Sequence, residues 1–203
     1  EEFLSGQIFL IDKPLGWTSF DLVKKVKNLI RTKYNLKKIK VGHAGTLDPL
    51  ATGLLIVCTG KFTKRISEIQ GQIKIYTGEI TLGGTTASYD LETEIDTRYQ
   101  ISHITKRLMQ DIALLFTGEI DQKPPIFSAL KRDGERLYEK ARRGESIEIE
   151  ARKVRVHSFE ITAIEMPKIS FEIKCSKGTY IRSIAHDFGA ALDSGAHLSK
   201  LCR

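Results

Sequence analysis

The chain has 203 residues, of which 41% are hydrophobic and 28% are charged, a composition typical of a globular protein that buries its own core. Its longest apolar runs, such as residues 54–58, are too short to cross a bilayer, and its first residues lack the basic and apolar stretches of a secretory signal. We therefore expect neither a membrane protein nor a secreted one, and the formal net charge of +7 favours an anionic partner only weakly.

The first part of the chain predicts strands around one amphipathic helix. Apolar residues recur every three or four positions from Phe20 to Tyr34, and lysines gather towards the far end, as the helix dipole prefers. Ser19 is expected to cap this helix. The other elements predicted here are a strand at 7–12, a Pro- and Gly-containing turn at 13–16, a short strand near 39–41, a loop at 42–53 and a strand at 54–58.

The rest of the chain predicts mainly strands, with a few helices. In the strand expected at 72–82, apolar residues occupy odd positions first and even positions later, which indicates a bulge near Thr77 and Gly78. The whole order predicts an α+β domain with a mixed, mostly antiparallel sheet and packed helices. The other expected elements are short helices at 62–71 and 135–143, a polar loop at 83–98, a helix at about 102–116, strands at 146–150, 153–165 and 169–176, and a helix starting near Thr179.

Basic residues are concentrated in two stretches. The segment between Asp21 and Asp48 contains no acid, and a second stretch, 123–143, is rich in lysine and arginine with three acids among them. Two basic surfaces suit a polyanion, most often nucleic acid, although solvated helix faces explain the charge about equally well. The basic residues of the first stretch are Lys24, Lys25, Lys27, Arg31, Lys33, Lys37, Lys38 and Lys40.

Several kinds of site are not expected from the sequence. The pair Gly60-Lys61 lacks the earlier glycine and the following Ser or Thr of a phosphate-binding P-loop. Neither the cysteines nor the histidines have the spacing of metal ligands. We therefore predict no metal and no cofactor, and we interpret the three cysteines as reduced structural thiols.

The loop at 42–53 is the first place where chemistry is expected. It carries glycines, a proline and threonines around Asp48, between two apolar strands. Glycines let a backbone approach a ligand closely, and a rigid turn can present a carboxylate to a substrate. Judged only from this pattern, however, an Asp before a Pro is more often a turn former.

The full string Gly-His-Ala-Gly-Thr-Leu-Asp-Pro-Leu-Ala-Thr-Gly-Leu-Leu, at 42–55, resembles the catalytic loop of the TruB family of tRNA pseudouridine synthases. Three further blocks along the chain resemble family motifs: residues 12–19, residues 124–142 and, late in the chain, residues 176–184 together with 195–198. The resemblance covers essentially the whole chain, and residues 124–142 are similar to the RNA-gripping insertion of the bacterial members.

The resemblance implies a pseudouridine synthase catalytic domain over 1–203, with a thumb-like insertion at about 123–152. The family continues past this point into a C-terminal RNA-binding module, which we expect to be absent from this chain. The implied activity is isomerisation of the T-loop uridine, position 55 of tRNA, to pseudouridine. The implied enzyme is a cytoplasmic monomer that binds the T-stem-loop and needs no guide RNA, protein partner or membrane.

Carried over position by position, the resemblance assigns the catalytic aspartate to Asp48, with Arg182 as its partner and Tyr76 stacking on the target base. Without the resemblance, ordinary structural roles for these side chains would be favoured. The implied substrate-binding residues are His43, Tyr76, Tyr180 and Leu201, and the implied RNA contacts are Lys13, Lys64, Lys131, Arg132 and Arg142.

The reaction explains why such residues are needed. The uridine must leave the RNA stack, and its C1′–N1 bond must be replaced by a C1′–C5 bond. A carboxylate can attack the sugar or remove a proton from it, and the sequence leaves both roles for Asp48 open. Two other hypotheses also stay open: an RNA-binding or tRNA-folding protein without catalysis, and an Asp-dependent glycosidase or nucleosidase.

Overall fold

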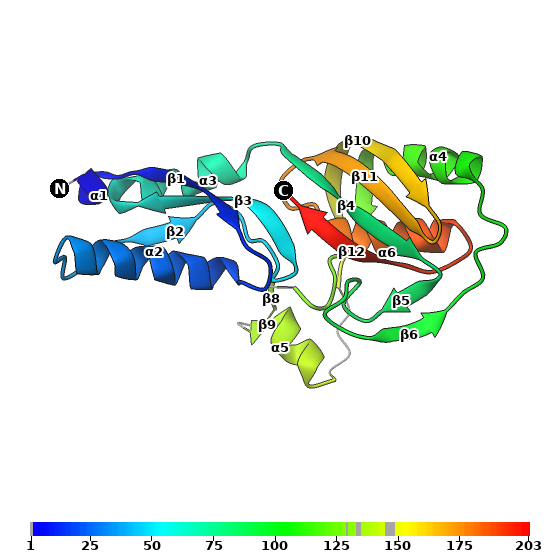
Figure 1. Ribbon diagram of the computed structural model, residues 1–203, viewed down its shortest axis with the longest axis horizontal. Coiled ribbons are helices and arrows are strands. Elements are labelled where there is room, and N and C mark those ends of the chain that lie inside the picture. Colours follow the sequence, from blue (N-terminus) through cyan, green and yellow to red (C-terminus); the bar gives the residue numbers. More distant parts are fainter. Residues whose placement is uncertain (1, 129, 133–134, 145–148) are drawn as a thin grey trace. The chain divides into compact units, whose positions relative to one another are not determined.

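The computed structural model describes residues 2–128, 130–132, 135–144 and 149–203 of the chain (Figure 1). The chain divides into two compact units. The first unit comprises residues 1–73 and 201–203, and the second comprises residues 74–200. The sequence pattern gave no indication of this division. Strand β12 (Ala196–Cys202) begins in the second unit and ends in the first.

The first unit is built around one strand, β3 (Ala51–Thr59). Strand β1 (Ile8–Lys13) pairs with it antiparallel from Ile8 opposite Cys58 to Lys13 opposite Gly53. On β3 there also lie β2 (Val41–His43), which is antiparallel, and the end of β12, which is parallel to it. The helices of this unit are α1 (Glu2–Ser5), α2 (Ser19–Lys33), α3 (Ile66–Gln70) and the 3-10 helix η1 (Gly60–Arg65).

Helix α2 packs its apolar stripe on this small sheet (Figure 1). Leu22 and Val23 form a buried cluster with Leu55 and Val57 of β3. The predicted cap is wrong by one residue, because Thr18 is the N-cap and forms a reciprocal capping box with Asp21. Ser19 is instead the first residue of the helix, and its hydroxyl is bonded elsewhere, to Leu47.

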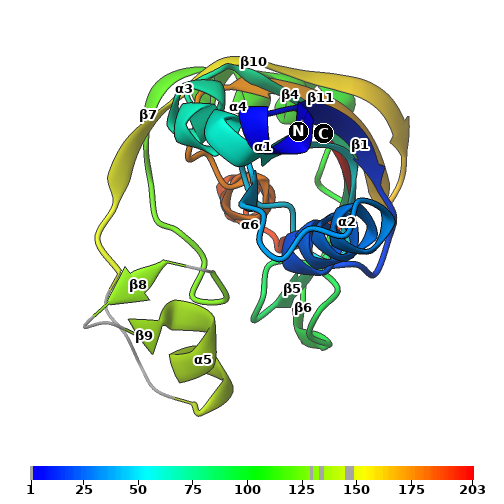
Figure 2. The same ribbon diagram turned by 90° about the vertical axis from the view of Figure 1, so that its left-hand side faces the viewer.

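The second unit is a sheet in the order β12-β4-β11-β10-β7 with helices packed on it. Its ladders β4–β11, β11–β10 and β10–β7 are antiparallel. The short elements β8, β9 and α5 lie together, apart from these strands (Figure 2). The elements are β4 (Lys74–Leu82), β5 (Gly84–Thr86), β6 (Ile95–Arg98), α4 (Lys106–Leu115), β7 (Gly118–Gln122), β8 (Lys131–Arg132), β9 (Glu135–Arg136), α5 (Leu137–Arg142), β10 (Arg152–Glu165), β11 (Lys168–Cys175) and α6 (Ile181–Ala191).

The core of the second unit is aromatic. The ring of Phe159 on β10 lies 5.3 Å from that of Phe188 on α6 and 6.3 Å from that of Phe171 on β11, measured between centroids. Phe171, Phe188 and Ile184 are fully buried or nearly so. Burial of such large side chains is what holds α6 to the sheet.

The predicted α+β class is confirmed, and the mostly antiparallel character of the pairing agrees with it. The predicted bulge is wrong, because the β4–β11 ladder runs from Thr81 to Lys74 without a shift of register. Even positions of β4 face the core throughout, and the apolar Ile73 and Ile75 before and in the strand are simply half exposed.

Polar short strands account for most of the missed elements. The predicted loop at 83–98 contains the hairpin β5–β6, and β7 and β12 were also not predicted. Helix α4 begins at Lys106, after its N-cap Thr105, rather than near 102. The strand expected at 146–150 falls mostly on residues outside the described part of the chain.

Replacing Gly189 by Ala should change the stability of the protein in the direction opposite to that expected from helix propensity. Ala is favoured over Gly in a helix by about 1 kcal/mol, so Gly189→Ala in α6 would normally stabilise. Here an added Cβ would lie 2.4 Å from the Ala196 nitrogen and 2.5 Å from the Ala196 Cβ, both on β12. We expect a net loss of about 1–3 kcal/mol of unfolding free energy in urea titrations.

The matched control is Ala190→Gly, at an exposed position of the same helix, which should lose only about 1 kcal/mol through helix propensity. A Gly189→Ala variant as stable as the parent would mean that α6 and β12 are not packed this closely.

Candidate active site

A buried lysine supports the loop that carries Asp48. Lys13, the last residue of β1, has no exposed surface, and its ammonium group donates to the backbone oxygens of Pro14, Trp17 and Pro49. The amide of Gly16 also donates to the Pro49 oxygen, over 2.8 Å. The turn after β1 and the loop at 44–50 are thus bound to one another around a single cation.

Helix α2 holds the same loop from its first residue. The Ser19 hydroxyl accepts from the Leu47 amide over 2.8 Å and donates to the Leu47 oxygen over 3.0 Å. Leu47 itself is buried, with 3% of its surface exposed. These two reciprocal hydrogen bonds fix Leu47, the residue immediately before Asp48. Helix α2 therefore helps to set the position of Asp48.

Arg203 holds the two ends of the loop. Its guanidinium donates to the Gly45 oxygen over 3.1 Å and, through Nε and Nη2, to the Leu54 oxygen. The Arg203 backbone lies so close to Gly53 that a Cβ there would be 2.5 Å from its oxygen, and Gly53 has a φ of +95°. Only glycine suits this position, which explains the glycine of the motif in physical terms.

Asp48 is half-buried and has a positive charge near it. Burial lowers the pKa of the Lys13 ammonium, and the negative charge of Asp48 opposes that shift. The two side chains therefore interact electrostatically within the first unit. A cation near a carboxylate favours the charged form of that carboxylate, and the half-buried position of Asp48 leaves it reachable for a ligand.

His43 and Leu201 are the expected site residues that lie in the same unit as Asp48. Burial lowers the pKa of the His43 imidazole, the Arg203 guanidinium lowers it further, and a backbone hydrogen bond with Gly45 opposes both. The ring is therefore neutral at pH 7. Leu201 is half-buried and pairs with Ala51, at the beginning of β3. His43 thus lies on β2 directly before the Asp48 loop, and Leu201 lies on β12 beside the first residue of β3, directly after the loop.

Arg182 lies at the centre of a buried polar group in the second unit. Its side chain is 4% exposed, and its guanidinium donates to the backbone oxygens of Ser88 and Phe127 over 3.1 and 2.9 Å. Its Nε lies 3.6 Å from Oδ2 of Asp90, whose side chain is also buried. Sequence reasoning assigned Arg182 to the site but missed Asp90, its partner in this unit.

The loop at 86–93 shows how a signal for Asp90 could have been found. Its backbone is held by its own hydroxyls: Thr86 donates to the Asp90 oxygen over 2.6 Å, and Ser88 and Thr93 bond to each other. Asp90 in turn accepts from the Glu92 amide. A Thr-x-Ser-x-Asp pattern in a predicted polar loop is typical of such local capping, so the acid at its end was a candidate for a buried role.

Tyr76 and Tyr180 lie in different parts of the second unit. Tyr76 is on the buried face of β4, opposite Ile173, and is 9% exposed. Tyr180 is the N-cap of α6, and its backbone amide and oxygen both bond to the side chain of the buried Gln122. Its ring lies under the Arg152 guanidinium at 5.0 Å. Tyr76 is therefore held by the sheet, and Tyr180 by its contacts with Gln122 and Arg152.

The expected RNA contacts have different outcomes. The expectation for Lys13 is corrected, because a side chain with no exposed surface and an ammonium bound to three backbone oxygens cannot contact a phosphate. Lys64, on η1, is exposed. The side chains of Lys131, Arg132 and Arg142 lie outside the described part of the structure.

Among the described residues, no group of His, Cys, Asp and Glu side chains is arranged to hold a metal ion. In that same part of the chain, no helix is long and apolar enough to span a bilayer.

Most of the chain matches one known protein family. Residues 31–181 match the family described as "TruB family pseudouridylate synthase (N terminal domain)", so the fold and the loop at 42–53 are those of a pseudouridylate synthase. That match covers well over half of the chain. The chain therefore belongs to the TruB family.

Two curated relatives align with this chain over all or nearly all of its length. The "tRNA pseudouridine synthase B" of Flavobacterium johnsoniae is 63% identical, with the alignment covering 100% of this chain and 89% of that protein. The protein of the same name from Phocaeicola vulgatus is 51% identical over 99% of this chain and 86% of its own length.

A solved structure extends the likeness to more distant proteins. A chain of a "Cbf5-Nop10-Gar1 Complex" is 30% identical and superposes with a TM-score of 0.73. The match covers 99% of this chain but only 48% of that one, so this chain spans about half the length of that neighbour.

The burial of Lys13 makes a testable prediction. Lys13→Met keeps the length of the side chain but removes the donor shared by three backbone oxygens, and leaving such groups unpaired costs about 1–3 kcal/mol. We expect a loss of that size in urea-induced unfolding followed by circular dichroism. Lys25→Met, at an exposed position of α2, is the control and should be within about 0.5 kcal/mol of the parent. Equal stabilities for the two variants would show that Lys13 does not support the loop.

Proposed function

We propose that this chain isomerises the T-loop uridine of tRNA, position 55, to pseudouridine, with Asp48 as the catalytic carboxylate. The main structural support for this proposal is the environment of Asp48. It is a half-buried carboxylate on a loop that is held by hydrogen bonds with Lys13, Ser19 and Arg203. Membership of the TruB family and the names of its bacterial relatives support the choice of reaction and substrate.

The chemistry assigned to Asp48 is confined to the sugar of the target nucleotide. The C1′–N1 bond breaks, the uracil turns over in the pocket, and C1′ bonds to C5, whose hydrogen leaves to solvent. Asp48 acts either as the nucleophile at C1′ or as the base that removes a sugar proton. The product has the same mass as the substrate, and no second carboxylate is needed to activate water, unlike in a glycosidase.

The remaining site residues are proposed in supporting roles. The aromatic face of Tyr76 stacks on the uracil after it leaves the RNA stack, and His43, Tyr180 and Leu201 line the space that it enters. The cationic Arg182 is the partner of the catalytic carboxylate and favours its ionised form. The buried ion pair with Asp90 then serves to orient the Arg182 guanidinium.

Basic surfaces away from Asp48 hold the rest of the tRNA. We assign residues 123–152 as a thumb-like insertion within a catalytic domain that spans 1–203, with Lys131, Arg132 and Arg142 as its RNA contacts and Lys64 as another. The enzyme acts as a monomer in the cytoplasm, without a guide RNA or protein partner. In support, this chain is more similar to the bacterial relatives than to the chain from the "Cbf5-Nop10-Gar1 Complex".

The decisive variant is Asp48→Asn. Asn keeps the size and turn-forming ability of Asp, so it should leave the fold and tRNA binding intact. The amide can neither attack C1′ nor accept a sugar proton, and loss of such a group commonly lowers the rate by roughly 10⁴-fold. We expect that loss in single-turnover release of tritium from tRNA labelled at uracil C5, with a cooperative melting curve that shows the variant to be folded.

The matched control is Asp12→Asn, which changes a carboxylate on β1 next to Lys13 and should keep the parental rate. An Asp48→Asn variant that releases tritium within tenfold of the parent would reduce Asp48 to a turn former. Binding of tRNA by the parent without any tritium release would indicate an RNA-binding or tRNA-folding protein. Release of free uracil would instead indicate a glycosidase.

A further inference from the structure

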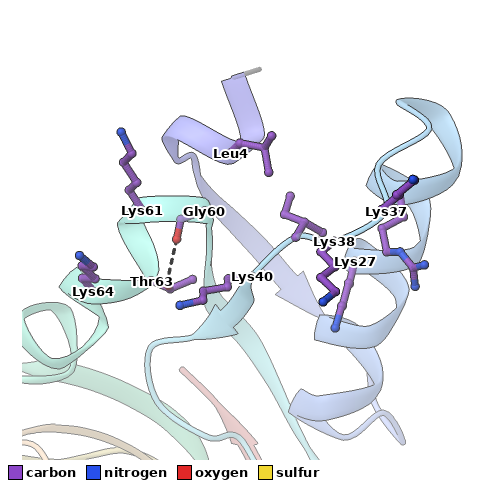
Figure 3. Close-up of a pocket in the computed structure, with 11 residues that line it drawn as sticks. Leu4, Lys27, Lys37, Lys38, Lys40, Gly60, Lys61, Thr63 and Lys64 are labelled. Carbon is purple, nitrogen blue, oxygen red and sulfur yellow. Dashed lines mark hydrogen bonds between the residues drawn. The ribbon is translucent and has the colours of Figure 1, made fainter.

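The first unit contains a pocket lined mainly by cations (Figure 3). Its volume is about 670 Å³. Its walls come from four segments that are separate in the sequence: helix α1, helix α2, the turn before β2, and η1 directly after β3; the last three carry its cations. The cations that line it are Lys27, Arg31, Lys37, Lys38, Lys40, Lys61 and Lys64.

The pocket is built for a negative ligand. Its other lining residues are Leu4, Ile39, Gly60 and Thr63, so it contains no carboxylate. Figure 3 shows Lys61 and Lys64 on one side, Lys27, Lys37 and Lys38 on the other, and Lys40 between them.

The cations of this pocket are available to a ligand. All seven are exposed, and among the described residues none of them forms an ion pair with an Asp or Glu. Gathering so many like charges from three segments is unfavourable unless an anion neutralises them.

The register of the small sheet places this pocket far from Asp48. Strand β3 begins at Ala51, directly after the Asp48 loop, and ends at Thr59, directly before the pocket residues Gly60 and Lys61. Nine extended residues span roughly 26 Å. The pocket therefore cannot hold the nucleotide that Asp48 attacks, and it forms a second site on the same unit.

We propose that this basic pocket binds the phosphodiester backbone of the substrate tRNA, several nucleotides away from the target uridine. The inference rests on the tRNA substrate proposed above and adds to it a docking site remote from catalysis. Long, exposed lysines on an open surface suit the successive phosphates of a backbone, which need charge at several points rather than one enclosed cage.

Two other ligands fit the pocket less well. A small anion would need a few converging donors, whereas these cations line a pocket with the volume of several phosphates. A membrane surface would need apolar residues beside the charge, and of the two apolar residues in the pocket, Leu4 is 43% exposed and Ile39 only 6%.

The test compares two triple variants of equal charge. Lys27→Gln, Lys38→Gln and Lys61→Gln together remove one cation from each of the three walls that carry cations. Lys24→Gln, Lys25→Gln and Lys33→Gln together remove three exposed cations from α2 outside the pocket. Melting curves establish that both proteins are folded, so differences in binding reflect the position of the charges.

The two RNA probes differ in reach. One is a full tRNA transcript. The other is a T-loop hairpin with a stem of three base pairs, which at roughly 3.4 Å per step is too short to extend 26 Å from the target uridine. Dissociation constants are measured for both RNAs at several salt concentrations, and tritium release from both is followed at saturating protein.

For the pocket variant we expect tRNA binding to weaken about tenfold and the log–log salt slope to become shallower by about two, since each phosphate contact contributes about −0.7 to −0.9. Hairpin binding should stay within twofold of the parent, and tritium release at saturation should not change. For the α2 variant, tRNA binding should weaken by less than about threefold, the part due to net charge alone.

Equal weakening by the two variants would contradict a docking site, because only net charge would then matter. Equal weakening of tRNA and hairpin would contradict a remote site, and so would unchanged tRNA binding. Tight binding of inorganic phosphate to the parent, lost in the pocket variant while tRNA binding is unaffected, would indicate a small-anion site instead. Absence of tritium release from every RNA would refute the proposed function but not the docking site, which the binding data test separately.

Discussion

The first unit depends on one buried cation. Lys13 ends β1 with its ammonium group enclosed, and a buried ammonium is tolerated only where its donors are used. Here the backbone oxygens of Pro14, Trp17 and Pro49 use them, which forces the turn after β1 and the Asp48 loop to share one centre. The electrostatic interaction with Asp48 adds a reason for the site to need this residue. The lysine of the opening motif is thus a support of the Asp48 loop rather than a contact for RNA.

Two further anchors make the loop rigid before any ligand arrives. Ser19 fixes the residue before Asp48, and Arg203 joins the Gly45 side of the loop to the beginning of β3. A catalytic group gains most when its position is set in advance, since no free energy is then spent on ordering it during the reaction. The same β3 that starts at this loop ends at the basic pocket, so one strand sets the spacing between proposed chemistry and proposed docking.

The sequence predicted the elements that have a strong apolar period and the loop that carries a specific motif. It predicted β1, α2 and the core of β3 to within a few residues, and it marked the loop around Asp48. It failed where side chains act over a long sequence distance. The partner of Ser19 is Leu47 and that of Arg182 is Asp90, and in neither case does the sequence show which two residues pair. The hairpin β5–β6 was missed because its residues are polar and its pairing is held by backbone bonds.

The proposed role of Asp48 requires a loop that is already fixed in the free protein, and hydrogen exchange of individual amides measures this directly. The Leu47 amide donates to the Ser19 hydroxyl and the Ala51 amide to the Asp48 oxygen. In the RNA-free protein we predict that both exchange within about tenfold of the Leu55 amide in the centre of β3, because they open only when the unit opens. Exchange of both amides at the rate of an unstructured peptide, with Leu55 still protected, would show that the loop is not held by these contacts and would contradict the account.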